Sequence, residues 1–108
     1  MNLTMNFQVT VNIDNEIAAI YLSGELTSNT FSEFQEVIEQ VSDVNIQKLY
    51  LHMEKLTYMS SAGLRVIIFA KQKMGSQVDI YIIGASEMIT DTLKKTGFHH
   101  SVILQDSI

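Results

Sequence analysis

The order of the hydrophobic patterns along the chain constrains its fold more than any other feature. Residues 7–13 alternate apolar and polar side chains, which is typical of a half-buried strand. Asp14 and Asn15 give a turn signal, and residues 16–23 are predicted to be the second strand of a hairpin. The sequence therefore predicts an antiparallel strand pair at its start.

Helical and strand patterns alternate after this hairpin. Apolar spacing and capping residues predict helices at 31–41, 60–74 and 86–97, and short apolar runs predict strands at 48–53, 78–83 and 102–104. Such alternation predicts an α/β fold in which right-handed crossovers join parallel strands. We expect a mixed sheet of four to five strands, with the helices mainly on one face.

Length and composition limit the chemistry that the chain can perform. Its 108 residues suit one domain at 1–108 that folds without disulfide bonds or a structural metal. The absence of cysteine excludes a disulfide framework and a thiol nucleophile. The three histidines, His52, His99 and His100, are too few and too badly spaced for a convincing metal site. We therefore expect no metal and no cofactor.

Charge and hydropathy argue against two classes of partner. The chain has seven basic and twelve acidic residues, and the resulting net charge of −5 disfavours nonspecific nucleic-acid binding. No apolar run approaches the roughly 20 residues of a membrane span, and residues 1–6 lack the features of a signal peptide. We expect a cytoplasmic protein that binds neither nucleic acid nor membrane.

Two hydroxyls, those of Ser60 and Ser61, lie between a predicted strand and a predicted helix. A helix N-terminus offers unpaired backbone N–H donors and the positive end of the helix dipole. Such a place suits a phosphate, either bound or covalently attached. Loops that leave the carboxyl ends of strands are the usual sites in α/β sheets, and the loops predicted at 24–29 and 57–61 are expected to lie side by side.

These two loops resemble segments of the STAS domain, the fold of bacterial anti-sigma-factor antagonists. Residues 24–26, Gly-Glu-Leu, resemble that family's Gly-Glu-Leu-Asp segment after its second strand. Residues 59–64, Met-Ser-Ser-Ala-Gly-Leu, resemble its Met-Asp-Ser-Ser/Thr-Gly-Leu segment at the start of its second helix. The expected element order also matches that family over nearly the whole chain.

The resemblance implies a phosphorylation-switched binding module rather than an enzyme. In that family a serine of the second motif is phosphorylated by a partner anti-sigma kinase, and the matching residue is Ser61, with Ser60 as second choice. The unphosphorylated form binds the kinase, and a phosphatase restores binding after phosphorylation. The implied partner surface comprises Glu25, Thr27, Met59, Ser60, Ser61, Ala62, Gly63 and Arg65. We expect a monomer or a weak dimer, and the sequence leaves the oligomeric state open.

The chain departs from the family pattern at two positions. The family often has aspartate where this chain has Thr27 and Ser60. A carboxylate beside the acceptor hydroxyl can orient it or take its proton during phosphoryl transfer, and neither hydroxyl can do so at neutral pH. The departures leave open a second reading, a non-switching scaffold or small-ligand domain that uses the same surface.

Several other side chains can be interpreted either as structural or as functional. Val66 and Phe69 suit the core or a partner contact equally well, whereas Tyr58 and Met59 are expected to pack under the loop. We expect solvated side chains at His99 and His100.

A nucleophilic role for Ser61 would need an adjacent base such as His52, which could point away from the site.

Overall fold

The computed structural model describes residues 7–107, which form a mixed five-stranded sheet and three α-helices. The expectation about a signal peptide concerns residues 1–6, which lie outside the described residues. The elements in chain order are β1 (Gln8–Asp14), β2 (Ile17–Leu26), α1 (Phe31–Ser42), β3 (Lys48–Met59), α2 (Ser61–Met74), β4 (Asp79–Ile83), α3 (Glu87–Thr96), a short 3-10 turn (Phe98–His100) and β5 (Ile103–Gln105).

The strands lie in the sheet in the order in which they occur in the chain, β1-β2-β3-β4-β5. β1 and β2 are antiparallel, and every other neighbouring pair is parallel. The predicted α/β class and mixed sheet are therefore confirmed. No helix among residues 7–107 combines the length and the apolar character that a membrane crossing needs.

A two-residue turn joins β1 to β2. Asn15 and Glu16 have φ values of 52° and 67°, and Asp14 pairs with Ile17 across the turn. Positive φ at both central residues is the mark of a type I′ turn, whose twist matches that of the strands that it connects. The hairpin prediction is confirmed, with the turn one residue later than Asp14 and Asn15.

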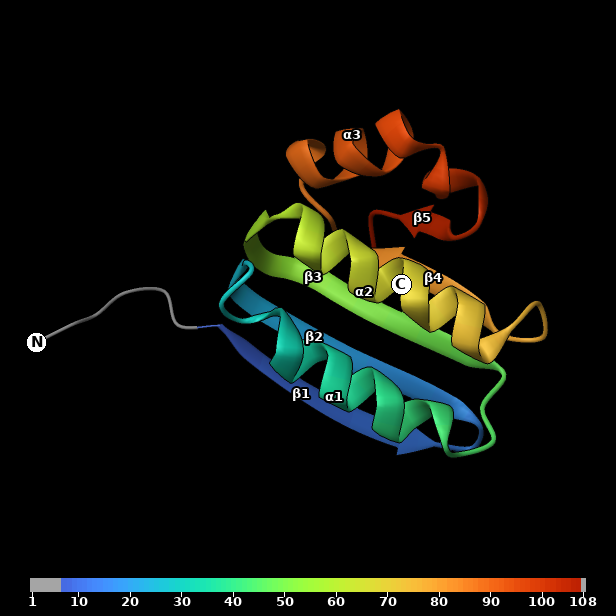
Figure 1. The fold of residues 1–108 in the computed structure, drawn as a ribbon. Helices are drawn as coiled ribbons and strands as arrows, with labels where there is room; N and C mark the ends of the chain where they lie inside the picture. Colours follow the sequence, from blue (N-terminus) through green and yellow to red (C-terminus); the bar gives the residue numbers. More distant parts are fainter. Residues whose placement is uncertain (1–6, 108) are drawn as a thin grey trace, which may run out of the picture.

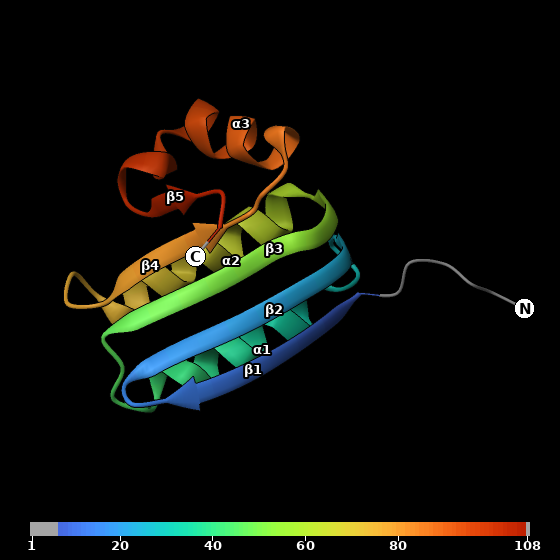
Figure 2. The same ribbon diagram turned by 180° about the vertical axis from the view of Figure 1, so that it is seen from behind.

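Two helices, α1 and α2, cover the same face of the sheet (Figure 1). The core lies between them and the inward side chains of the strands, and its largest fully buried members include Phe34, Leu26, Met53 and Ile67. α3 lies at the β4–β5 end of the sheet and buries Ile89 and Leu93. The opposite face is open, as Figure 2 shows from behind.

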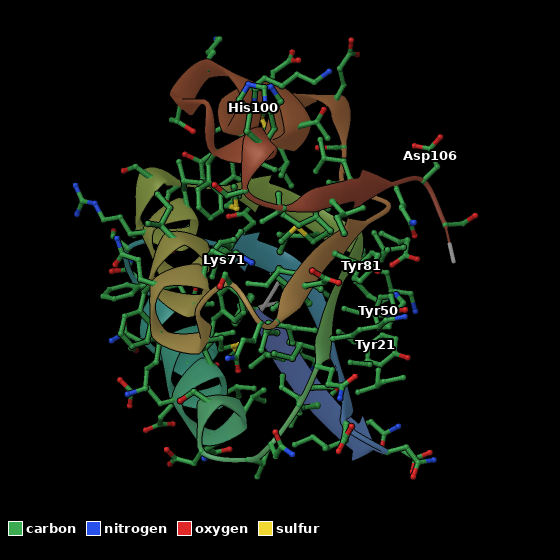
Figure 3. The ribbon with its side chains drawn as sticks, turned by 90° about the vertical axis from the view of Figure 1, so that its right-hand side faces the viewer. Tyr21, Tyr50, Lys71, Tyr81, His100 and Asp106 are labelled. Atoms are coloured by element: carbon green, nitrogen blue, oxygen red, sulfur yellow. The ribbon has the colours of Figure 1, made fainter. Side chains whose placement is uncertain are left out.

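The open face carries a row of aromatic rings. Tyr21, Tyr50 and Tyr81 project from three neighbouring strands, away from α1 and α2 (Figure 3). The rings of Tyr50 and Tyr81 lie 4.7 Å apart, and the ring of Tyr21 stacks on His52 at 4.4 Å. This row gives the open face an aromatic surface that the hydrophobic pattern alone did not indicate.

Two strands are longer than the sequence predicted. β2 runs to Leu26 rather than to residue 23, and β3 runs to Met59 rather than to residue 53. Their pairing continues across register shifts on either side of Ser23 and Gly24, and Gly24 has a φ of 88°. In β3 the alternation of buried and exposed side chains breaks after Met53, so the pattern in the sequence stops before the strand does. In β2 the alternation of burial continues to Leu26, but the glycine at position 24 was interpreted as the end of the strand.

Candidate functional site

The first turn of α2 presents the two candidate serines differently. Ser60 is the N-cap residue, as predicted, and its hydroxyl oxygen accepts a hydrogen bond of 3.2 Å from the backbone N–H of Ala62. Ser61 is the first residue of the helix and is exposed. The hydroxyl of Ser60 is therefore committed to the helix end, whereas that of Ser61 is accessible to a second protein.

The two predicted loops do lie side by side. Leu26 at the end of β2 pairs with Met59 at the end of β3. Directly after this pair, the backbone N–H of Ser60 donates a 2.8 Å hydrogen bond to the carbonyl oxygen of Leu26. The hydroxyl of Thr57 also donates to the carbonyl oxygen of Gly24 at 3.0 Å. Parallel pairing therefore places the start of α2 beside the β2–α1 loop.

Hydroxyl groups hold the β2–α1 loop in shape. The hydroxyl of Thr30 donates to the carbonyl oxygen of Glu25 at 2.9 Å and accepts from the backbone N–H of Thr27 at 2.8 Å. The hydroxyl of Thr27 in turn accepts from the backbone N–H of Asn29 at 3.1 Å. Thr27 therefore stabilises the turn before α1, which is a structural role that a carboxylate at this position could share.

Gly63 allows α2 to approach the ends of β2 and β3 closely. A Cβ atom at this position would lie 2.7 Å from Cγ and Cδ2 of Leu26 and 2.8 Å from Cγ of Met59. Contacts that short do not occur between real side chains and Cβ atoms. Packing therefore explains the Gly-Leu pair of the motif. Gly63 allows the close approach of α2, and Leu64 is buried in the core.

Exposure divides the predicted partner-binding residues into two groups. Glu25, Ser61 and Arg65 are exposed, and Thr27, Ser60 and Ala62 are partly exposed. Met59 and Gly63 are buried, so they can affect a partner only through the shape of the loop. The accessible members lie around the start of α2 and the neighbouring end of β2.

A groove between α1 and α2 includes Ala62, the residue that follows Ser61. It has a volume of about 360 Å³ and is lined by Ser28, Phe31, Gln35, Ala62, Arg65, Val66 and Phe69. Val66 is only 1% exposed and belongs to the core, whereas Phe69 is partly exposed and lies 6.0 Å from the Nζ atom of Lys73. Of the two candidates for partner contact, only Phe69 presents a substantial surface.

Sequence reasoning missed the α1 side of this groove. Ser28, Phe31 and Gln35 reach the site only because α1 packs against α2 on the same face of the sheet. The helical spacing indicated which side of α1 is apolar, but it did not indicate the neighbour of that helix. The sequence contains no local pattern that predicts that α1 and α2 pack against each other.

One prediction about an individual side chain is wrong, and a second holds only in part. Tyr58 was expected to pack under the loop, but it is 42% exposed, because it lies opposite the exposed Glu25 of β2 and beyond the part of β3 that pairs with β4. His99 was expected to be solvated, but its Nδ1 atom is buried without a hydrogen-bond partner among the described residues. Its ring lies 3.9 Å from that of His100, which is exposed. His99 as a whole is partly exposed, so the short turn after α3 buries one edge of its ring rather than the whole side chain.

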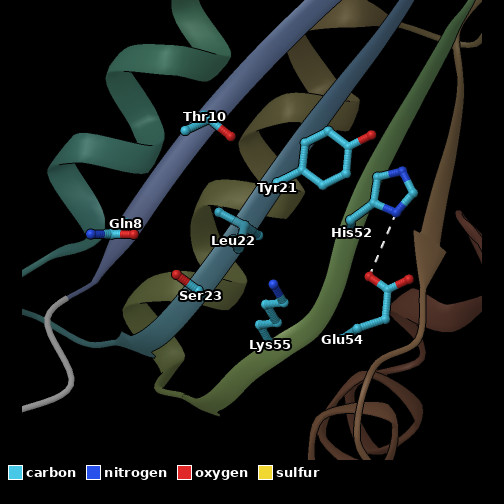
Figure 4. Close-up of a pocket in the computed structure, with 8 residues that line it drawn as sticks. All are labelled: Gln8, Thr10, Tyr21, Leu22, Ser23, His52, Glu54 and Lys55. Carbon is cyan, nitrogen blue, oxygen red and sulfur yellow. Dashed lines mark ion pairs between the residues drawn. The ribbon is translucent and has the colours of Figure 1, made fainter.

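His52 is not positioned as a base for Ser61. Its side chain lies on the open face of the sheet in a hollow of about 410 Å³, where it stacks on Tyr21 and lies 3.5 Å from Glu54 (Figure 4). Ser61 begins a helix on the other face. Residues 7–107 also contain no cluster of three histidine or carboxylate side chains that could hold a metal ion.

Comparison with known proteins gives a family match. The profile of the STAS domain matches residues 8–108. An anti-sigma-B factor antagonist of Staphylococcus aureus is 24% identical over 94 residues, which cover 86% of this chain and 87% of that protein. The similarity therefore extends over nearly the full length of both.

Solved structures share the fold at low sequence identity. An anti-sigma factor antagonist from Mycobacterium paratuberculosis superposes with a TM-score of 0.87 at 16% identity, covering 95% of this chain and 88% of that one. The antagonist SpoIIAA gives a TM-score of 0.74 in its unphosphorylated form, at 17% identity, with 95% and 90% covered. Its phosphorylated form, from Bacillus, gives 0.72 at 16% identity, with 92% and 90% covered.

Proposed function

Because the chain belongs to the STAS-domain family, we propose that it is a phosphorylation-switched binding protein of the anti-sigma-factor-antagonist type. It binds a serine kinase of the anti-sigma type when Ser61 is unphosphorylated and releases that kinase when Ser61 carries a phosphate. A serine phosphatase returns it to the binding form. It acts in the cytoplasm and has no catalytic activity of its own.

The observation that carries this proposal is the position of Ser61. Its side chain is exposed at the first residue of α2, beside the groove between α1 and α2. The names of the relatives support the choice of partner, since the matched proteins are anti-sigma factor antagonists and SpoIIAA is known in phosphorylated and unphosphorylated forms. One exposed hydroxyl beside a docking groove is what such a switch requires.

The domain itself should tolerate the phosphate. A phosphoserine adds about −1.5 to −2 charges near neutral pH. The positive end of a helix dipole favours a negative charge by roughly 0.3–1 kcal/mol. Arg65 lies one turn further along α2 and is exposed, so it adds a cation near the same point. Phosphorylation should therefore leave the fold intact.

The docked partner should respond in the opposite way. A kinase that contacts Ser61 and fills the groove leaves no room for three phosphate oxygens and their hydration. An uncompensated charge buried in an interface costs several kcal/mol, and each 1.4 kcal/mol is about a tenfold change in affinity. Phosphorylation should thus weaken binding at least about a hundredfold.

The transfer step needs a base that the partner supplies. The hydroxyl oxygen of Ser61 attacks the γ-phosphorus of the ATP held by the kinase, the bond to the ADP oxygen breaks, and the hydroxyl proton leaves. Neither Thr27 nor Ser60 can take that proton at neutral pH, and both are engaged in backbone hydrogen bonds. A carboxylate of the kinase therefore acts as the base.

Phosphorylation with the cognate kinase tests the proposal. The protein is incubated with that kinase and ATP, and the modified residue is mapped by mass spectrometry, with Ser61→Ala as the variant and Ser60→Ala as the matched control. We expect phosphate on Ser61 in the wild type and in Ser60→Ala, and none in Ser61→Ala. Labelling of neither serine, by a kinase that labels its other substrates, would contradict the switch.

A binding measurement separates the second candidate, a non-switching scaffold. The replacement of the family's aspartates by Thr27 and Ser60 favours that candidate. Calorimetry with the purified kinase should show a loss of affinity when Ser61 is phosphorylated. Equal affinity for the two forms would favour the scaffold.

A further inference from the structure

No other strand among the described residues pairs with the outer edge of β1, and this edge carries little of the usual protection. β1 lies at one end of the sheet, and the views of the two faces of the sheet show no other described element beside its outer edge (Figures 1 and 2). Residues Gln8–Asp14 include no proline, lysine or arginine, and the β1–β2 register is continuous. Natural edge strands are usually blunted by such residues, by bulges or by shortness. The other edge strand, β5, is only three residues long.

The hairpin turn fixes which backbone groups of β1 face outward. In a two-residue hairpin the residues that flank the turn, here Asp14 and Ile17, exchange both backbone hydrogen bonds. Alternate residues back along β1 then bond to β2, and the residues between them point their N–H and C=O groups away from the sheet. The outward set is Val9, Val11 and Ile13.

The same three residues form an apolar row at this edge. Their register partners on β2 are Leu22, Ile20 and Ala18, which are all buried under the helices. Val11 is nevertheless 38% exposed and Ile13 is 44% exposed. Outward-facing hydrogen-bonding groups and exposed β-branched side chains therefore coincide at Val11 and Ile13, whereas Val9 is partly buried.

We propose that β1 pairs with β1 of a second copy of the chain, antiparallel and centred on Val11, and so joins two sheets into one. A two-fold axis at Val11 pairs all seven residues of β1 with their counterparts. Val9 then lies opposite Ile13 of the second copy, and Val11 lies opposite its own counterpart. About six backbone hydrogen bonds form, because each of the three facing pairs exchanges two.

This register is chemically self-complementary. The only charged residue of β1, Asp14, lies opposite Gln8 of the second copy, whose amide can donate to its carboxylate. Apolar side chains meet apolar ones on the helix-covered side, and Thr10 meets Asn12 on the open side. A shift of one residue would set apolar side chains against polar ones. Ser61 lies at the start of α2 and stays accessible in such a dimer.

Sedimentation equilibrium tests the proposal on the full chain without any kinase, so its outcome is independent of the proposed function. We expect the average mass to rise with protein concentration from 12.2 kDa towards twice that value. Because the chain carries a net charge of −5, added salt should strengthen the association. A mass of one chain up to about 1 mM protein would overturn the proposal.

Two lysine variants of β1 locate the interface. Val11→Lys places two ammonium groups against each other at the two-fold axis, and we expect at least about a tenfold weaker association. Thr10→Lys is the matched control, since the same charge then lies on the open side opposite Asn12, and we expect its association to match the wild type within about twofold. Equal association of Val11→Lys and wild type would overturn the proposal.

Amide hydrogen exchange gives a readout that needs no variant. The N–H groups of Thr10 and Asn12 bond to β2 and should be protected at every protein concentration. The N–H groups of Val9, Val11 and Ile13 should become protected only as the concentration rises. Rapid exchange of these three amides at a concentration where the mass shows a dimer would place the interface elsewhere and overturn the proposal.

Discussion

The backbone N–H of Ser60 donates a hydrogen bond of 2.8 Å to the carbonyl oxygen of Leu26. This single bond links the end of β2 to the N-cap residue of α2, so residues far apart in the sequence form one surface. Gly63 lets the first turn of α2 pack closely against the side chain of Leu26. The exposure of Ser61 depends on this arrangement.

Gly63→Ala should destabilise the domain by about 1–3 kcal/mol, because the added Cβ meets Leu26 and Met59 at distances that force the loop to move. The free energy of unfolding in urea measures the effect. Ser61→Ala is the control on the same helical turn, and it should stay within about 0.5 kcal/mol of wild type. Equal stability of the two variants would show that α2 does not pack as closely as described.

Ser60→Ala should cost about 0.5–2 kcal/mol of stability, because the variant loses the hydroxyl that accepts from the N–H of Ala62. Ser60→Asp should retain wild-type stability, since aspartate is an equally good N-cap residue and its charge suits the helix dipole. Thermal unfolding of the two variants beside the wild type measures the difference. Two variants of equal stability would argue against a capping role for Ser60.

Val66→Ala and Phe69→Ala should affect different properties. Val66 is 1% exposed, so its truncation should cost about 2 kcal/mol of stability. Phe69 is partly exposed in the groove beside Ser61, so its truncation should weaken kinase binding about tenfold or more, as loss of an aromatic anchor does. Urea unfolding and calorimetry with the kinase measure the two effects. Full kinase affinity in Phe69→Ala would remove the groove from the interface.

Arg65→Ala should reduce the stabilisation that a phosphate on Ser61 receives from its own helix. The exposed guanidinium lies one turn beyond Ser61, and a pair at this spacing contributes about 0.2–0.5 kcal/mol. The stabilities of phosphorylated and unphosphorylated protein are compared by urea unfolding, in wild type and in Arg65→Ala.

Lys73→Ala is the control for this comparison, because Lys73 lies in the last turn of α2, far from Ser61. The change in stability on phosphorylation should be the same in Lys73→Ala as in wild type. An identical change in Arg65→Ala as well would mean that Arg65 does not contact the phosphate.

Local chemistry made several features predictable. The capping hydroxyl of Ser60 and the glycines after α2 and α3 mark helix ends that the structure reproduces. The type of each element followed from side-chain periodicity, because a strand and a helix repeat over different numbers of residues. The STAS family and the mixed sheet were predicted from this order together with two short motifs, and both are confirmed. The role of Ser61 stays a prediction.

The sequence by itself determined the element types, their order and the residue at which α2 begins, because these depend on neighbours within a few positions along the chain. Only the tertiary structure decided how far β2 and β3 extend, that Val66 is buried while Phe69 lines a groove, and that no other strand of residues 7–107 pairs with the outer edge of β1. The physical reason is that strand pairing and burial depend on which distant segment lies alongside, and no local pattern of side chains records that neighbour.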